Sequence, residues 1–389
     1  MAIDKSNILS FRNIFILGLL VSLGVTFSEV VRGEHLNFLI FQNSTLDFWK
    51  GINPYGPDWF RHGLDYFLYA PPFSVLFAPF AYVPGWTGPF AWNLFNYLLY
   101  AYAIYTLPRF NARTKCYILL YTIPILAPGQ MSFQYNITVA AMYLIAFSLM
   151  ERNKAPWAVL VIMISALTKI YGLFELAILL FYPKFWRNIG YALLFGMVIA
   201  LLPLLKLAPG ELMPYYGTWI DALGSHKDTR VWETFFSIKI LWGGIAPSYA
   251  TYIQMGVLAW LGGLLFACRR FWNDFSFRAG ALGILMGWII LFSNAAEKHT
   301  YIIALAGFLL WYWSRRERTV PDKILYWANF AILVLMPIDL LCPPAVMRFF
   351  FDTLDANQWL FIFTWLVMIC KTMIIPLARR GQTLEQKLI

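Results

Sequence analysis

Long apolar runs recur from one end of the sequence to the other, and this feature limits the possible folds more than any other. Of the 389 residues, 60% are apolar and only 13% are charged. A water-soluble domain would need an implausibly large core to bury so many apolar side chains, whereas a bilayer solvates them directly. We therefore predict an all-α polytopic membrane protein that forms one integral membrane domain over residues 1–389.

The apolar runs can be counted as membrane spans. A spanning helix needs about 20 apolar residues, although helices held inside a bundle can be shorter. We predict about twelve spans, at 13–32, 88–107, 116–128, 134–150, 155–168, 172–183, 188–207, 248–268, 278–294, 300–314, 324–342 and 357–377. The apolar piece 69–83 opens with Tyr69-Ala70-Pro71-Pro72 and closes with Pro84-Gly85, which favours a re-entrant or surface-lying helix over a true span.

The basic residues indicate the orientation. With a cytoplasmic N-terminus, twenty of the thirty lysines and arginines fall in the loops on that side, as the positive-inside rule requires. We therefore place the chain in a bacterial inner membrane with its polar loops 33–68, 208–247 and 293–300 facing the periplasm. The basic residues form short clusters and not one helix face, so we expect membrane lipids and no nucleic acid as partners.

Lys169 is the most costly residue for a membrane to accommodate. It interrupts the apolar stretch Ala166-Leu167-Thr168-Lys169-Ile170-Tyr171-Gly172, where an ammonium costs on the order of a few kcal/mol. Gly172 allows the helix to break, so that Lys169 can meet a phosphate or another part of a substrate. A structural salt bridge to Glu175 is the alternative.

Two outer segments carry further candidates. The short segment Glu297-Lys298-His299 offers a carboxylate as general base or cation ligand and an imidazole to orient it, or else it is a solvated turn. In loop 33–68, Asp47 and Asp65 can deprotonate a hydroxyl. The remaining candidates are expected to bind substrate, with a packing role as the alternative for Gln130: Asn37, Gln130, Lys298, Arg61, Lys227 and Arg230.

Several motifs do not occur in the sequence. It has no P-loop, no GxGxxG at a strand-helix junction, no HExxH and no GxSxG, and it lacks the alternating strand-helix pattern of a nucleotide-sugar-binding domain. The four cysteines have no CxxC spacing, and no metal-ligand cluster stands out. We expect neither a metal nor another cofactor, and an activated sugar would have to arrive on a lipid.

At these residues the chain resembles the polyprenol-phosphate-mannose-dependent mannosyltransferases, GT-C-class membrane glycosyltransferases, in their divergent bacterial branch. The pieces that carry the resemblance are Asn37-Phe38-Leu39-Ile40-Phe41, Gly51-Ile52-Asn53-Pro54-Tyr55, Tyr69-Ala70-Pro71-Pro72-Phe73, Ala78-Pro79-Phe80, Trp92-Asn93, Gly129-Gln130, Ala166-Leu167-Thr168-Lys169 and Glu297-Lys298-His299-Thr300-Tyr301. The resemblance implies transfer of a sugar, mannose most simply, from a polyprenyl-phosphate donor to a hydroxyl of a lipid or glycan acceptor.

The resemblance also implies site roles. It suggests Lys169 near the donor phosphate and His299 where donor and acceptor meet. Much of the family has a catalytic Asp about eighteen residues before the Pro-Tyr pair, but Asn37 stands there. An amide cannot act as a general base, so the candidates for that role are Glu34, Asp47, Asp65 and Glu297.

Two other functions are compatible with the sequence. Intramembrane charge, a re-entrant segment and twelve spans also fit a transporter or lipid flippase. A structural subunit of an envelope-assembly complex is a third possibility. The enzyme is favoured because no inverted repeat is apparent and because the polar residues converge on one face of the bilayer.

Overall fold

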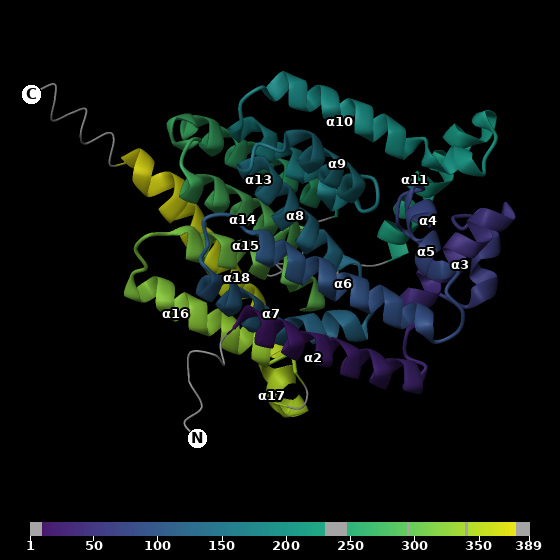
Figure 1. Cartoon of the computed structure of the whole chain (residues 1–389), viewed down its shortest axis with the longest axis horizontal. Helices are drawn as coiled ribbons and strands as arrows, with labels where there is room; N and C mark the ends of the chain where they lie inside the picture. Colours follow the sequence, from purple (N-terminus) through teal and green to yellow (C-terminus); the bar gives the residue numbers. More distant parts are fainter. Residues whose placement is uncertain (1–9, 230–246, 294–295, 297, 339–340, 379–389) are drawn as a thin grey trace, which may run out of the picture. The chain divides into compact units, whose positions relative to one another are not determined.

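A computed structural model describes residues 10–229, 247–293, 296, 298–338 and 341–378 (Figure 1). Over these residues the chain forms helices and no strand, which confirms the predicted all-α class. The chain divides into two compact units, Met1–Val231 (unit 1) and Trp232–Ile389 (unit 2). That both units form one membrane domain stays a prediction.

Unit 1 is a bundle of long helices with several short ones beside it. The α-helices are α2 (Phe11–Arg32), α3 (Leu36–Lys50), α4 (Phe73–Leu76), α5 (Ala78–Ala81), α6 (Thr87–Thr106), α7 (Ala112–Met131), α8 (Asn136–Glu151), α9 (Ala155–Ala166), α10 (Phe185–Ala200) and α11 (Leu212–Thr229). The 3₁₀ helices are η1 (Pro57–His62), η2 (Ile170–Phe181), η3 (Leu202–Leu205) and η4 (Pro209–Glu211).

Hydrogen bonds between turns distinguish two ends of this bundle. At one end, Asn93 at the start of α6 donates to the carbonyl of Gln130 at the end of α7, and the α7–α8 turn contacts the α9–η2 turn, which holds Lys169. We call this the Lys169 end. At the other, the basic end, Arg152 after α8 donates to the carbonyl of Thr106 at the end of α6.

Glycines end the first two helices of unit 1. Gly33 ends α2 and Gly51 ends α3, with φ of 74° and 82°. Residues with side chains rarely adopt this left-handed conformation, so glycine is the residue that closes each helix there. The two turns place α3 and the loop after it at the Lys169 end.

The apolar piece 69–83 is not a continuous span. It forms α4 and α5, which have four residues each and would reach only about 6 Å apiece along a helix axis, against a hydrocarbon core of roughly 30 Å. Both short helices pack on α3. This geometry agrees with the predicted re-entrant or surface-lying segment.

Unit 2 contains α13 (Pro247–Ala267), α14 (Phe275–Leu291), α15 (Tyr301–Ser314), α16 (Val320–Asn329), α17 (Pro344–Arg348) and α18 (Ala356–Ile369). Its short elements are η5 (Arg269–Phe271), η6 (Lys298–Thr300), η7 (Phe330–Leu335), η8 (Phe349–Thr353) and η9 (Cys370–Ile374). Helices α14 and α15 approach each other closely at two glycines. A Cβ added to Gly283 would lie only 2.4 Å from the carbonyl oxygen of Gly307. Small residues permit such an approach of two backbones, as in many membrane helix pairs.

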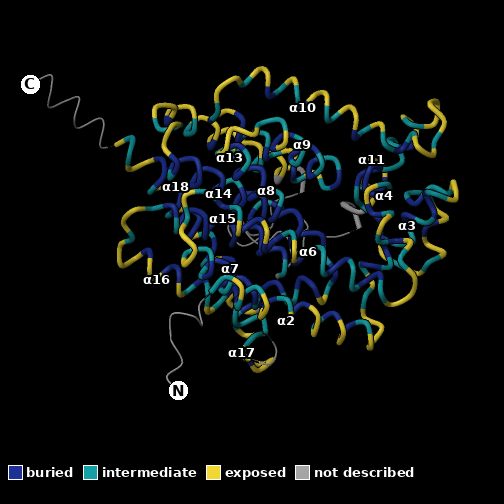
Figure 2. The backbone as a smooth tube through the Cα atoms, in the orientation of Figure 1, coloured by how far each residue is buried: buried dark blue, intermediate teal, exposed yellow. Residues whose placement is uncertain are grey.

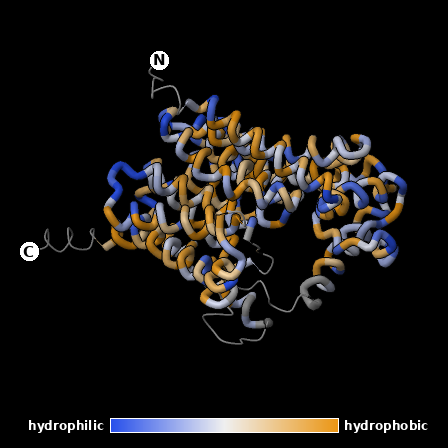
Figure 3. The backbone as a smooth tube through the Cα atoms, turned by 90° about the horizontal axis from the view of Figure 1, so that it is seen from below, coloured by the Kyte–Doolittle hydropathy of each residue, from blue (hydrophilic) through white to orange (hydrophobic). Residues whose placement is uncertain are grey.

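Apolar residues run along most helices, and hydrophilic residues lie mainly at helix ends and in loops (Figure 3). Within the described part of the chain, three helical segments are long and apolar enough to cross a membrane: Phe11–Arg32, Phe185–Leu205 and Ala356–Ala378. Along α10, apolar side chains such as Leu193 and Met197 are exposed, as expected for a lipid-facing helix (Figure 2). A helix lies at each predicted span, but the number of membrane crossings stays a prediction.

Candidate active site

Lys169 lies in the turn between α9 and η2, among groups that suit a charged ligand. Its Nζ donates a hydrogen bond of 2.7 Å to the Oδ1 of Asn136. The same ammonium lies 5.1 Å from the ring centroid of Tyr171 and 5.7 Å from that of Tyr69. Aromatic faces and an amide oxygen stabilise a half-buried cation. These contacts explain how an ammonium is held at this position in the helical bundle.

The local sequence explains the position of Lys169. A Cβ on Gly172 would lie 2.3 Å from the backbone nitrogen of Ala166, so only glycine lets η2 fold back against α9 at this point. The alternative of a salt bridge to Glu175 is not seen. Glu175 is fully buried, and neither of its carboxylate oxygens has a hydrogen-bond partner among the described residues.

The loop before α4 completes one wall around Lys169. Tyr55 donates its hydroxyl proton to the carbonyl of Tyr69 at 2.7 Å, and Ala70 donates its backbone N–H to the carbonyl of Thr168 at 3.2 Å. Burial raises the pKa of Tyr55 well above its usual value, so this phenol remains a donor at any physiological pH. These bonds hold the Tyr69 ring beside Lys169.

Helix α11 also forms hydrogen bonds with the loop between α3 and α4. Asn53 donates to the hydroxyl of Thr218 at 3.0 Å, and the Trp219 indole donates to the carbonyl of Leu68 at 3.1 Å. The loop between α3 and α4 is thus anchored to α11 at two points.

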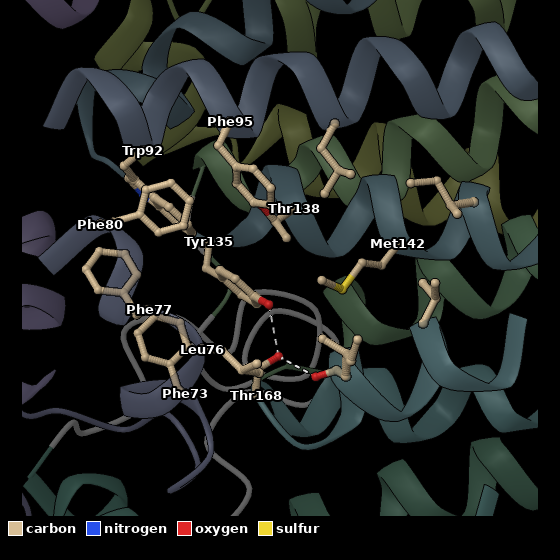
Figure 4. A pocket seen from close by; sticks show the side chains of 14 residues that line it. Phe73, Leu76, Phe77, Phe80, Trp92, Phe95, Tyr135, Thr138, Met142 and Thr168 are labelled. Carbon is tan, nitrogen blue, oxygen red and sulfur yellow. Dashed lines mark hydrogen bonds between the residues drawn. The ribbon is translucent and has the colours of Figure 1, made fainter. Parts of the chain in front are cut away.

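An apolar cavity of about 270 Å³ lies directly beside Thr168 (Figure 4). Side chains of α4, α5, α6, α8 and α9 surround it. Its wall is mostly aromatic and aliphatic, and includes Phe73, Phe77, Trp92, Phe95, Met142 and Val161. Tyr135 and Thr168 also line it and share a hydrogen bond of 3.0 Å. The Tyr69 ring, which lies beside the Lys169 ammonium, has its centroid 4.5 Å from that of Phe73 and 5.6 Å from that of Tyr135, two residues of the cavity wall. Tyr69 therefore links the surroundings of Lys169 to the cavity.

Asp47 forms a second charged group at the Lys169 end. It is 3% exposed in α3, and its Oδ2 forms an ion pair with Arg61 Nη2 at 2.7 Å and a hydrogen bond with His62 Nε2 at 2.8 Å. A buried carboxylate is stable in this position because these two contacts compensate its desolvation. Both contacts fall on Oδ2.

Three other predicted residues of unit 1 have different surroundings. Asp65 is exposed, and its carboxylate accepts from the backbone N–H of Tyr66. Asn37 is half-buried and donates to the carbonyl of Ser132 at 2.7 Å. Gln130 is 1% exposed and donates to the hydroxyl of Ser22 at 2.7 Å, which favours its packing alternative.

The structure describes less of the remaining predicted residues. Glu297 and Arg230 lie outside the described residues, as do the side chains of Lys298 and Lys227. His299 is half-buried in η6, directly before α15 of unit 2. Their predicted site roles stay predictions.

Four residues to which the sequence pattern gave no role lie around the charged groups. Tyr69, Tyr171 and Asn136 contact Lys169, and His62 contacts Asp47. Two of these residues could have been found from the sequence. Tyr69 opens the Pro-Pro piece that supports the resemblance, and Asn136 is an amide at the start of a long apolar run.

No group of three or more metal-ligating His, Cys, Asp or Glu side chains occurs within the described ranges. The expectation of a metal-free and cofactor-free site stays a prediction.

Concave, mostly apolar cavities with a few polar groups are typical of ligand sites, and this end of unit 1 has such a cavity. The family model of glycosyltransferase family 87 matches residues 67–294 of the 389, and the chain belongs to this family of GT-C-type membrane glycosyltransferases. Among curated proteins and among solved structures, no match is found. The matched range includes Lys169 and the residues that line the cavity, whereas Asp47 precedes it.

Proposed function

We propose that this membrane glycosyltransferase takes its sugar, mannose most simply, from a polyprenyl-phosphate donor and transfers it to a lipid or glycan hydroxyl. The observation that carries this proposal is that the Tyr69 ring lies beside the Lys169 ammonium and also packs on Phe73 of the cavity wall. A polyprenyl-phosphate sugar has a phosphate next to a long apolar chain, and these two parts match the ammonium and the cavity.

The reaction can be built from these parts. The acceptor oxygen attacks the anomeric carbon and forms a new C–O bond, while the bond from that carbon to the phosphate oxygen breaks. The phosphate leaves with the electron pair, and Lys169 stabilises the charge that develops on it. The acceptor proton moves to a carboxylate, and alignment of the two substrates lowers the barrier further.

Asp47 is our leading candidate for that carboxylate among the described residues, because Arg61 and His62 hold it in one orientation. Glu297 remains a candidate from the sequence, and exposed Asp65 ranks third. Arg61, whose side chain is 40% exposed, would bind substrate phosphate or sugar. Roles for Asn37, Lys227, Arg230, Lys298 and His299 in binding or positioning are proposed on sequence grounds alone.

The experiment that tests the function uses full-length protein in lipid nanodiscs. It would be incubated with radiolabelled polyprenyl-phosphate mannose, glucose and galactose, and in parallel with GDP-mannose and UDP-glucose, with an envelope lipid extract as acceptor. Transfer from one polyprenyl-phosphate sugar and from neither nucleotide sugar is expected. Transfer from a nucleotide sugar would overturn the donor proposal, and lipid movement without transfer would favour the flippase.

The proposed orientation, with the Lys169 end facing the periplasm, rests on the positive-inside rule. Single cysteines at exposed Asp58 and Lys154 report on the two ends of unit 1, in a background where exposed Cys370 is replaced by serine. In intact cells a membrane-impermeant maleimide should label position 58 and leave position 154 unlabelled. The reverse pattern would invert the topology.

A further inference from the structure

A second cavity, of about 630 Å³, lies in unit 2 and differs in character from the first. Residues from the start of α14, the end of α15 and η9 line it. They include Asp274, Phe277, Trp311, Arg315, Arg316 and Lys371. Charged and aromatic side chains therefore share one concave wall.

The base of this cavity is firmly packed. The Trp311 indole donates to the hydroxyl of Thr372 at 3.1 Å, and Ser276 donates to the carbonyl of Ser314 at 2.6 Å. A Cβ on Gly280 would lie 2.8 Å from the side chain of Thr372, which leaves no space under the tryptophan. The cavity is thus a property of the packed helix ends.

The cations of this region differ in how they are compensated. Lys371 donates to the carboxylate of Asp322 at 2.6 Å, and Arg270 donates to the carbonyl of Pro376 at 2.9 Å. The Arg315 guanidinium lies 5.1 Å from the Trp311 ring centroid, and its buried Nε has no hydrogen-bond partner among the described residues. A buried N–H without an acceptor is unfavourable, so an acceptor is expected there.

The acidic residues on the wall do not supply that acceptor. Asp274 caps α14 by accepting from the backbone N–H of Ser276 at 2.9 Å. Glu317 is exposed, as is Arg316. Arg315 has an unused N–H and lies near an indole, and the exposed Arg316 is next to it in the chain. Arginine binds phosphate through its planar fork of N–H donors, so these two residues suit a phosphate ligand.

We propose that this cavity binds a phosphate group, with Arg315 and Arg316 as its ligands and Trp311 as the platform that orients Arg315. The phosphate comes from an anionic phospholipid headgroup or from a free phosphate compound. Basic pockets at helix ends bind anionic headgroups in other membrane proteins, and the positive-inside rule predicts that this end faces the cytoplasm. The site is separate from the proposed transfer reaction and does not depend on it.

Thermal unfolding of the full chain, delipidated in a neutral detergent, tests the proposal. Phosphatidylglycerol, phosphatidylcholine and inorganic phosphate are added separately. If the headgroup is the source, phosphatidylglycerol raises the melting temperature by about 5 °C at saturation, and phosphatidylcholine does not. If free phosphate is the source, inorganic phosphate alone gives the rise.

Two variants and a matched control assign the effect. Arg315→Gln and Arg316→Gln should each weaken binding by about tenfold or more. Arg316 is exposed, so its replacement leaves the fold intact even if Arg315→Gln unfolds the protein. The control is Arg318→Gln, because Arg318 stacks 4.5 Å from the Trp313 centroid and is not part of the wall.

Arg318→Gln should bind as the unmodified protein does. An equal loss in this control would mean that general surface charge, and not the cavity, attracts the ligand, and would overturn the proposal. Undiminished binding in both Arg315→Gln and Arg316→Gln, or no shift with phosphatidylglycerol and with phosphate alike, would also overturn it.

Discussion

The two ends of unit 1 each hold a half-buried lysine beside aromatic rings, yet the two lysines have different surroundings. At the basic end, Lys115 donates to the carbonyl of Tyr105 at 2.6 Å and lies 5.6 Å from the centroid of the same ring. At the Lys169 end, the ammonium contacts an amide and two rings next to an apolar cavity. The immediate contacts are alike, and the Lys169 end in addition has the cavity that Thr168 lines.

The other charges of the basic end follow the pattern of Lys115. Arg152 donates to the carbonyl of Thr106, and Glu151 accepts from Tyr182 while lying 3.8 Å from Arg109. Cations at helix C-termini satisfy carbonyls that the helix leaves open. Charge at the basic end therefore serves helix ends and topology, whereas charge at the Lys169 end adjoins space for a ligand.

The largest effect is expected from exchanging the two lysines for methionine. Lys169→Met should lower kcat/KM for the lipid-phosphate donor by at least about 10³-fold, because it removes the cation that stabilises the leaving phosphate. Lys115→Met should change it by no more than about twofold. Lys169→Arg keeps the charge and should retain part of the activity. Equal losses in both methionine variants, measured in nanodiscs, would show that the two ends do not differ in function.

The next largest effect is expected from replacing the candidate general bases. Asp47→Asn should lower kcat by about 10²- to 10³-fold with little change in donor affinity, since an amide cannot take the acceptor proton. Glu297→Gln and Asp65→Asn are assayed in parallel, together with Asn37→Asp. Thermal stability distinguishes a lost base from a lost structural contact, because Asp47→Asn also weakens the bonds to Arg61 and His62. Near-normal turnover in all three amide variants would exclude these three carboxylates as the base.

The contrast between the two ends also shows what the sequence could predict. The helices were predictable because each apolar run is local, and Lys169 stood out because a charge inside such a run is costly. The residues around Lys169 were not predictable, because Tyr69 and Asn136 reach it only through packing between helices far apart in sequence. Gly172 was expected to allow a break, but its structural reason is the close approach of η2 to α9.

The cavity could not be predicted from the sequence either. Its wall combines residues of the short helices α4 and α5 with residues of three longer helices. In the sequence, such aromatic residues are equally typical of an ordinary hydrophobic core. The same holds for the Asp47 group. Aspartate and arginine in one loop suggested function, but nothing local indicated that Arg61 and His62 fold back onto Asp47.

A smaller effect is expected from filling the cavity beside Lys169. Val161→Phe places a larger side chain into the cavity from α9, and we expect about a tenfold loss in kcat/KM for a long-chain polyprenyl-phosphate donor. A donor with only two isoprene units should be much less affected, because its chain needs less of the space. The control is Leu193→Phe on exposed α10. Equal losses with long and short donors would remove the cavity from donor binding.

The smallest effect concerns Gln130, whose amide bridges helices at the Lys169 end without facing the cavity. It donates to the Ser22 hydroxyl at 2.7 Å and to the Asn93 carbonyl at 3.2 Å. Gln130→Leu keeps the volume but leaves these acceptors unsatisfied, so the free energy of unfolding should fall by about 1–2 kcal/mol. Transfer should stay within about twofold of normal. Gln42→Leu is the matched control, since half-buried Gln42 makes one bond of 3.0 Å to the carbonyl of Ala81 and should lose less stability. A hundredfold loss of transfer in Gln130→Leu with unchanged stability would instead make this amide part of the substrate site, and polar residues at this end would then act on substrate even from inside the core.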